Sequence, residues 1–204
     1  MPFVAKGREQ RRPMLGGMTQ PGDFTAEGFL RMPDLPPHTE LIDGRLVFAR
    51  PQSKWHSRVV NLLVRELDAQ APPHLRADRE MVVRLGKRQA PEPDVVVVTA
   101  EAFDRSEPDA YYWSADVVLA VEAVSPDSED ADREVKPREY AAAGIGHFWR
   151  VENDEGQAVA CTYVLDPAVG CFVLAGVHRG RLTTLVPYAV DIDLDAVDAR
   201  SRWP

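Results

Sequence analysis

The sequence is poor in cysteine and has no long apolar run. Its two cysteines, Cys161 and Cys171, show no cysteine–histidine spacing typical of a zinc site. We expect two small buried residues on a hairpin centred near Asp166-Pro167, where they could face each other as reduced thiols of a cytoplasmic protein. No apolar stretch approaches the roughly 18 residues of a membrane span, and the N-terminus lacks the apolar segment of a signal peptide.

Positive charge is also scarce. Lysine and arginine number 24 against 32 aspartates and glutamates, which gives a net charge of −8. This balance excludes a protein coated with basic surface for non-specific DNA binding, but it leaves room for a local basic groove. The best candidate strip for phosphate contacts consists of Arg45, Arg50, Lys54 and Arg58. A solvated surface is the ordinary interpretation of such charges.

Proline, glycine and polar clusters divide the 204 residues into segments. We expect residues 1–22 to be a disordered N-terminal arm, 23–195 to be a single domain and 196–204 to be a tail. Hydrophobic periodicity predicts helices at 25–32, 55–69 and 131–143. It predicts strands within 40–50 around Asp43-Gly44 and at 75–85, 94–98, 116–124, 145–151, 159–165, 171–177 and 181–186.

The order of these elements predicts a mixed α/β domain around one central sheet. The runs 95–98 and 117–121 are fully apolar, which is typical of central strands covered on both faces. The last three predicted strands are typical of antiparallel hairpins.

Two carboxylates interrupt this apolar pattern. Asp94 opens one predicted strand, and Glu122 lies near the end of another. If these strands are antiparallel neighbours, the two carboxylates meet, and their burial is costly unless something satisfies them. A hard cation such as Mg²⁺ prefers oxygen ligands and keeps bound waters, one of which could attack a phosphodiester. The alternatives are a turn-capping role for Asp94 and an ordinary ion pair for Glu122.

A third set of polar residues follows on the predicted helix. Asp132, Lys136 and Tyr140 recur at intervals of four and therefore share one face. Lys136 would bring an ammonium group to the carboxylates, and Tyr140 would lie in the core with its hydroxyl bonded. Pro137 opposes this, because the residue before a proline is pushed away from helical geometry. Lys136 would then lie at the helix entrance, off the face of Asp132, or be an ordinary solvated lysine.

Seven segments occur in an order that resembles a known family. They are Glu-Leu-Ile-Asp-Gly (40–44), His56, Pro-Glu-Pro-Asp (91–94), Val-Glu-Ala-Val-Ser-Pro (121–126), Asp132-Arg133, Lys-Pro-Arg-Glu-Tyr (136–140) and Ala-Gly-Ile (143–145) with Phe-Trp-Arg-Val (148–151). Over roughly residues 24–190 the chain resembles the Uma family of restriction-endonuclease-like proteins, within the PD-(D/E)XK nuclease superfamily. The resemblance implies an α/β (α+β) fold with a mixed central β-sheet flanked by helices and C-terminal antiparallel hairpins.

The resemblance also implies a set of site residues. Asp94 and Glu122 would be metal ligands, with the carbonyl of Ala123 as a third. The superfamily places a lysine two residues after the glutamate, where this chain has Val124, and Lys136 on the next helix matches its substitute. Glu40 matches an early family carboxylate that would support the metal through water, and His56 would approach the substrate. Arg58, from the basic strip named above rather than from the resemblance, is the other expected substrate contact.

The function predicted from these residues is a Mg²⁺- or Mn²⁺-dependent endonuclease that cleaves nucleic acid, with DNA as the expected substrate. A homodimer is expected, because the late hairpins offer edge strands and cutting both DNA strands favours two-fold symmetry. One alternative is a non-catalytic nucleic-acid-binding or regulatory module on a nuclease fold. Another is a structural homo-oligomer whose carboxylates pair with basic residues.

Overall fold

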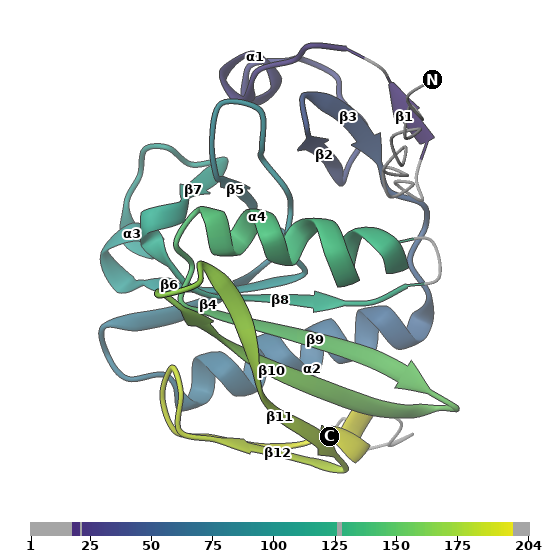
Figure 1. The fold of residues 1–204 in the computed structure, drawn as a ribbon, viewed down its shortest axis with the longest axis vertical. Helices are drawn as coiled ribbons and strands as arrows, with labels where there is room; N and C mark the ends of the chain where they lie inside the picture. The colour runs from purple at the N-terminus through teal and green to yellow at the C-terminus, as the bar shows by residue number, and fades with distance from the viewer. Residues whose placement is uncertain (1–17, 21, 126–127, 198–204) are drawn as a thin grey trace, which may run out of the picture.

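A six-stranded mixed sheet forms the centre of the molecule (Figure 1). The computed structural model describes residues 18–20, 22–125 and 128–197. Across the sheet the strands are β11 (Cys171–Arg179), β10 (Gln157–Asp166), β9 (His147–Asp154), β8 (Val117–Ala123), β6 (Val95–Thr99) and β4 (Leu75–Arg79). Only β8 and β9 are parallel neighbours in this sheet, and the other adjacent pairs are antiparallel. The predicted mixed fold with C-terminal hairpins is therefore confirmed.

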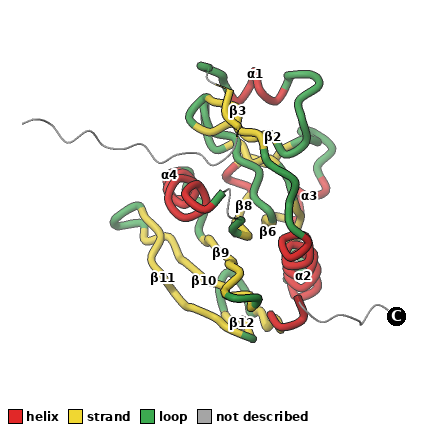
Figure 2. The backbone as a smooth tube through the Cα atoms, turned by 90° about the vertical axis from the view of Figure 1, so that its right-hand side faces the viewer, coloured by secondary structure: helices red, strands yellow, loops and turns green. Residues whose placement is uncertain are grey.

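Two helices cover the two faces of the sheet, as Figure 2 shows. They are α2 (Lys54–Gln70) and α4 (Lys136–Ala142). The valines of β6 alternate between these layers: Val95 and Val97 pack in the cluster that contains the α2 leucines, whereas Val96 and Val98 pack in the cluster that contains Tyr140 of α4. Because both faces are covered, every side chain of this strand's apolar run is buried, as its composition predicts.

A π-helical turn, Ala131–Val135, runs directly into helix α4 without a break. Pro137 has no N–H, and its ring would clash with the carbonyl four residues before it in a regular α-helix. The chain accommodates this with a wider turn, in which the N–H of Lys136 donates to the carbonyl of Ala131, five residues back. The alternative in which Pro137 separates Asp132 from Lys136 is therefore wrong. Gly144, at φ +81°, follows the helix as the predicted left-handed cap.

A small three-stranded sheet lies beside the end of the central sheet (Figure 1). Its strands are β1 (Met18–Gln20), β3 (Arg45–Phe48) and β2 (Thr39–Ile42), and α1 (Ala26–Leu30) packs on it. Asp43 and Gly44, at φ +53° and +72°, form the tight turn between β2 and β3 that the sequence predicts. This turn fixes the register that carries Glu40 to the site described below.

Several elements differ from the predicted ones. The single strand expected at 75–85 is broken at Glu80, whose φ of +53° is incompatible with a continuous strand. Its second half, β5 (Val82–Arg84), pairs instead with β7 (Tyr111–Trp113) in a two-stranded parallel sheet. The last predicted strand, β12 (Arg181–Thr184), pairs with β13 (Val190–Asp193). Helix α3 (Ala100–Asp104) and two 3-10 turns, Ser114–Asp116 and Leu194–Val197, complete the described elements.

The predicted arm and tail lie mostly outside the described residues, but Met18–Gln20 of the arm is a strand and Ala196–Val197 belong to the last 3-10 turn. Cys161 and Cys171 are free thiols that pair with different residues across the β10–β11 hairpin. Cys171 is exposed rather than buried, because it lies at the start of the terminal strand. Among the described helices none has the length and apolarity that crossing a membrane requires.

Candidate active site

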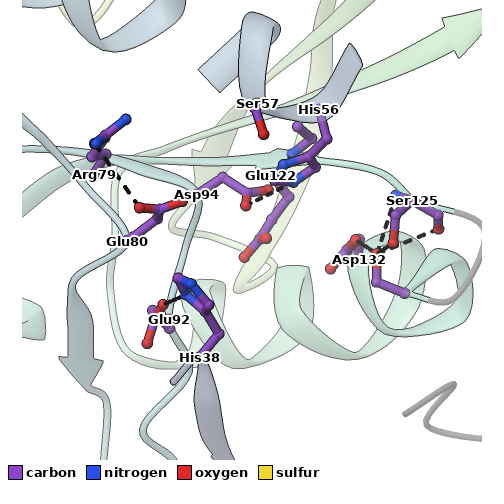
Figure 3. Close-up of polar contacts among 12 residues, drawn as sticks. His38, His56, Ser57, Arg79, Glu80, Glu92, Asp94, Glu122, Ser125 and Asp132 are labelled. Atoms are coloured by element: carbon purple, nitrogen blue, oxygen red, sulfur yellow. Dashed lines mark hydrogen bonds and ion pairs between the residues drawn. The ribbon is translucent and has the colours of Figure 1, made fainter. Parts of the chain in front are cut away.

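The antiparallel pairing of β6 and β8 brings two acidic residues to the same end of the sheet. Val95 lies opposite Val121, so Asp94, just before β6, and Glu122 fall at the next position of the register. In the alternation of side chains along β6 and β8, both residues fall on the face that α4 covers. Both also line the same cavity. In Figure 3 their side chains approach each other. Asp94 and Glu122 therefore lie on one side of the sheet, close together.

Lys136 lies at the centre of this group of carboxylates. Its Nζ is 3.0 Å from Oε2 of Glu122, 3.0 Å from Oε1 of Glu40 and 3.2 Å from Oδ1 of Asp132. The lysine is 5% exposed, so these contacts are shielded from water. Burial opposes its charge, but the carboxylates, Glu122 first, outweigh burial and raise the pKa of Lys136 well above its ordinary value. The lysine therefore stays charged.

The glutamate that interrupts β8 is fully enclosed. The hydroxyl of Tyr140 donates to Oε1 of Glu122 at 2.5 Å, so the two oxygens bind one hydroxyl and one ammonium. Burial raises the pKa of Glu122 well above its ordinary value, Lys136 opposes this, and repulsion from Asp132, Asp94 and Glu40 adds to it. The expectation that Tyr140 is a core residue with a bonded hydroxyl is confirmed.

Asp132 carries the same kind of penalty. Burial raises the pKa of its carboxyl to about 6, although Lys136 and a hydrogen bond from the hydroxyl of Ser128 oppose the shift. Three carboxylates, those of Glu40, Glu122 and Asp132, thus surround one ammonium group. With all three carboxylates ionised, the group would hold an excess of buried negative charge, which a cation would neutralise.

Asp94 is held by the strand beside it and by the start of α2. Its Oδ2 accepts a hydrogen bond from the backbone N–H of Ala123 at 2.7 Å, and its Oδ1 is 2.9 Å from Nε2 of His56. Ser53 caps α2 by accepting from the N–H of His56, which fixes that first turn. Burial opposes protonation of His56, but the hydrogen bond and charge of Asp94 outweigh it and raise the pKa of the imidazole.

These side chains line a cavity of about 220 Å³. It lies between the small sheet, the start of α2, the ends of β6 and β8 and the start of the helix that carries Lys136. The carboxylates that line it come from six residues: Glu40, Glu80, Glu92, Asp94, Glu122 and Asp132. The cavity is therefore acidic.

The donor atoms fit a divalent cation held by few protein ligands. Within residues 22–125 and 128–197, no three side chains of His, Cys, Asp or Glu form a ready-made metal site. The fitting set is instead the carboxylates of Asp94 and Glu122 with the main-chain carbonyl of Ala123. In a strand the N–H and C=O of one residue face the same neighbour, so this carbonyl lies on the side of Asp94, to which the N–H donates. Mg²⁺ is characteristically bound by one or two carboxylates and several waters.

The structure brings together most of the residues singled out in the sequence. Glu40, Asp94, Glu122, Ala123, His56 and Lys136 all line the cavity. Of the proposed basic strip, only Arg50 does so. Arg58 is exposed on α2, two residues and about 200° of helical turn from His56, so it faces away from the cavity.

A second pair of side chains on the cavity wall, His38 and Glu92, is not among the residues predicted from the sequence. Nδ1 of His38 lies 2.6 Å from Oε1 of Glu92 (Figure 3). The backbone N–H of Glu92 donates to Oε1 of Glu40 at 2.8 Å. Glu92 stands inside the segment Pro-Glu-Pro-Asp (91–94), which was the available signal. His38, whose φ is +57°, follows two prolines, and no sequence pattern marks it as a site residue.

Comparison with known proteins shows first a shared fold. A solved structure described as a putative nuclease belonging to DUF820, from Anabaena variabilis, is 20% identical, with a TM-score of 0.59 over 80% of this chain and 89% of that chain. The chain belongs to the Uma2 family, described as "Putative restriction endonuclease", whose family model matches residues 26–170. No curated protein matches the chain. The predicted family is thus confirmed.

Proposed function

We propose that the protein is a Mg²⁺-dependent endonuclease that hydrolyses phosphodiester bonds of DNA. The observation that carries the proposal is the convergence of Asp94 and Glu122 on one cavity, with the ammonium of Lys136 3.0 Å from Glu122. Membership in a family described as "Putative restriction endonuclease" supports the same reaction class. Free thiols are consistent with action in the cytoplasm.

In this proposal Asp94, Glu122 and the carbonyl of Ala123 would hold Mg²⁺, or Mn²⁺ in its place. When bound, such an ion polarises a phosphoryl oxygen and makes a water molecule more acidic. Lys136 holds Glu122 in place through its ion pair, and its charge would stabilise the negative charge that develops on the phosphate. Its raised pKa keeps it positive throughout the neutral range.

His56 and Glu40 orient the groups that face the phosphodiester. The imidazole of His56 fixes Oδ1 of Asp94, and Oε1 of Glu40 bridges Lys136 to the backbone of Glu92. The carboxylates of the cavity would repel a phosphate group unless a bound cation offset their charge. Lys54, exposed at the start of α2, would offer a phosphate contact outside the cavity, whereas Arg58 faces away from it.

We also propose a homodimer formed along β11. This nine-residue strand is terminal in the sheet, and three of its apolar side chains are half exposed: Val173 (50%), Leu174 (52%) and Val177 (56%). An antiparallel pairing of two copies centred on Ala175 would place Val173 opposite Val177 of the partner subunit. Sedimentation should show a dimer for the native chain and a monomer for Val177→Lys, with Val169→Lys, in the preceding turn, still dimeric. A native monomer would contradict this proposal.

Cleavage of a supercoiled plasmid with Mg²⁺ or Mn²⁺ tests the nuclease function. Asp94→Asn and Glu122→Gln should each lower the rate by about 100-fold or more, equivalent to about 2.7 kcal/mol of activation free energy. The matched control is Glu101→Gln, an exposed carboxylate in the first turn of α3, which should cleave normally. An RNA substrate is tested alongside, and faster cleavage of RNA would contradict the choice of DNA.

A non-catalytic binding module is the second candidate. The observation that favours it is the closed ion-pair cluster, in which Lys136 already contacts three carboxylates while Val124 stands where the superfamily has its lysine. Calorimetry with Mn²⁺, run with the plasmid assay, separates the two functions. Metal binding without cleavage of plasmid or RNA would favour this candidate, whereas turnover that depends on Asp94 would dismiss it.

A further inference from the structure

A second cavity, of about 460 Å³, lies on the opposite side of α4, between that helix and strands β9 to β11. Pro137 lines this cavity, whereas its neighbour Lys136 lines the acidic one. The two cavities are therefore separated by one helix and share no lining residue. The second cavity differs from the acidic one in the side chains of both its floor and its rim.

Aromatic rings form the floor of the second cavity. The ring of Phe148 is 5.6 Å from that of Tyr163 and 5.6 Å from that of Phe172, at interplanar angles of 30° and 33°. Phe148 is buried, while Tyr163 and Phe172 are half-buried and so keep part of their surface toward the cavity. A flat aromatic ligand gains stacking energy on such a surface.

Three arginines, Arg133, Arg138 and Arg150, line the same cavity with a single carboxylate, that of Glu134. Glu129 pairs with Arg133, and Glu152 pairs with Arg133 and Arg150, so within the described residues Arg138 is the arginine of this set that contacts no carboxylate. Glu152 contacts both Arg133 and Arg150, at 2.5 and 2.6 Å, and so fixes their positions. The three arginines thus form a partly ordered basic rim above the aromatic floor.

Two of these arginines have donors to spare. Arg138 uses only its Nε, which donates to the carbonyl of Glu134 at 2.9 Å, and Arg150 lies over the ring of Tyr163 at 5.7 Å. Within the described residues, the terminal nitrogens of Arg138 and Arg150 make no hydrogen bond. Guanidinium groups bind phosphate through paired N–H donors, so these nitrogens are suited to an anionic phosphate group.

We propose that this cavity binds a nucleoside monophosphate. The base would stack on Phe172, and the phosphate would bind Arg138 and Arg150, the second of which lies over Tyr163. The volume lies in the range of small-molecule sites. The proposal concerns binding alone and requires neither a metal ion nor nuclease activity, so it stands or fails independently of the function proposed above.

Calorimetric titration with dAMP tests the proposal, with deoxyadenosine and inorganic phosphate as separate ligands. All titrations use the full chain in EDTA, which removes any contribution from a metal ion. We expect dAMP to bind more tightly than either half of the molecule. Arg138→Glu should weaken dAMP binding about tenfold or more, and Phe172→Leu, which keeps an apolar side chain but loses stacking, about fivefold. Arg65→Glu, an exposed arginine on α2, is the matched control and should bind normally.

Several outcomes would overturn the proposal. One is an absence of dAMP binding at millimolar concentration. Another is dAMP binding that Arg138→Glu leaves unchanged, because the ligand would then lie elsewhere. A third is inorganic phosphate that binds as tightly as dAMP, which would reduce the cavity to a simple anion site. Circular dichroism of each variant confirms that it is folded, so that lost binding reports on the cavity.

Discussion

The two sides of helix α4 carry similar ion pairs in different surroundings. On the inner side the Lys136 and Glu122 side chains are 6% and 2% exposed, and on the outer side those of Arg133 and Glu152 are 41% and 23% exposed. Water screens the outer pair, so it contributes little to stability. The inner charges have lost their hydration, and removing one of them leaves the others uncompensated. Similar distances therefore correspond to very different energies.

The largest expected effect comes from the inner lysine. Lys136→Met should lower the free energy of unfolding by about 3–5 kcal/mol, because three carboxylates lose their shared cation. Urea unfolding at neutral pH measures it, with Lys54→Met, an exposed residue at the start of α2, as the control. A loss below about 1 kcal/mol would mean that the inner ion pairs contribute no more to stability than the exposed outer pair.

The next effect depends on pH. Because burial raises the pKa of Asp132 to about 6, the folded state keeps a proton between about pH 4 and 6 that the unfolded state has released. The native chain should therefore lose stability as pH rises through this window, by about 2–3 kcal/mol relative to Asp132→Asn, which cannot titrate. Unfolding curves of the two proteins at several pH values, in EDTA, give the difference. A difference that is constant from pH 4 to 7 would sink this prediction.

A smaller effect is expected from the tyrosine of the inner cluster. Tyr140→Phe removes the hydroxyl that donates to Glu122 at 2.5 Å and should cost about 1.5–3 kcal/mol, as expected for a hydrogen bond to a charged group. Tyr188→Phe is the matched control, since its hydroxyl donates to the neutral carbonyl of Leu67 at 2.7 Å and should cost about 1 kcal/mol. Equal losses in thermal unfolding would mean that Glu122 is uncharged in the metal-free protein.

The smallest effect is expected on the outer side. Arg133→Ala breaks the pair with Glu152 and should change the free energy of unfolding by less than about 1 kcal/mol. The change should shrink further in about 1 M salt, which screens exposed charges. Chemical unfolding with and without added salt provides the test. A loss comparable to that of Lys136→Met would erase the contrast between the two sides.

The sequence predicted the central strands and the meeting of Asp94 with Glu122, because long apolar runs and alternation constrain which strands are buried. It did not predict the break at Glu80 or the parallel pairing of β5 with β7, since a single residue at positive φ leaves no periodic signal. Whether Asp132 and Lys136 share a helix face could not be decided from the sequence, because Pro137 disfavours helical geometry at Lys136. In the structure the ion pairs of Lys136 with three carboxylates favour the contact.

The second cavity was not anticipated at all. Its floor combines Phe148, Tyr163 and Phe172 from three strands. Its rim combines Arg133 of the π-helical turn, Arg138 of α4 and Arg150 of β9. Each of these residues in isolation is an ordinary aromatic or solvated charge. The packing of the β10–β11 hairpin beside α4 brings them together. This long-range contact leaves no local pattern in the sequence.

The most direct measurement is a Mn²⁺ titration of the native protein, in which electron paramagnetic resonance reports the free ion. Asp94→Asn and Glu122→Gln are compared with Glu101→Gln. We expect the native chain and the control to bind Mn²⁺ with the same affinity. Both site variants should bind it at least about 100-fold more weakly. Equal affinity in all four proteins, or no binding by the native chain, would contradict the claim that these two carboxylates form a metal site.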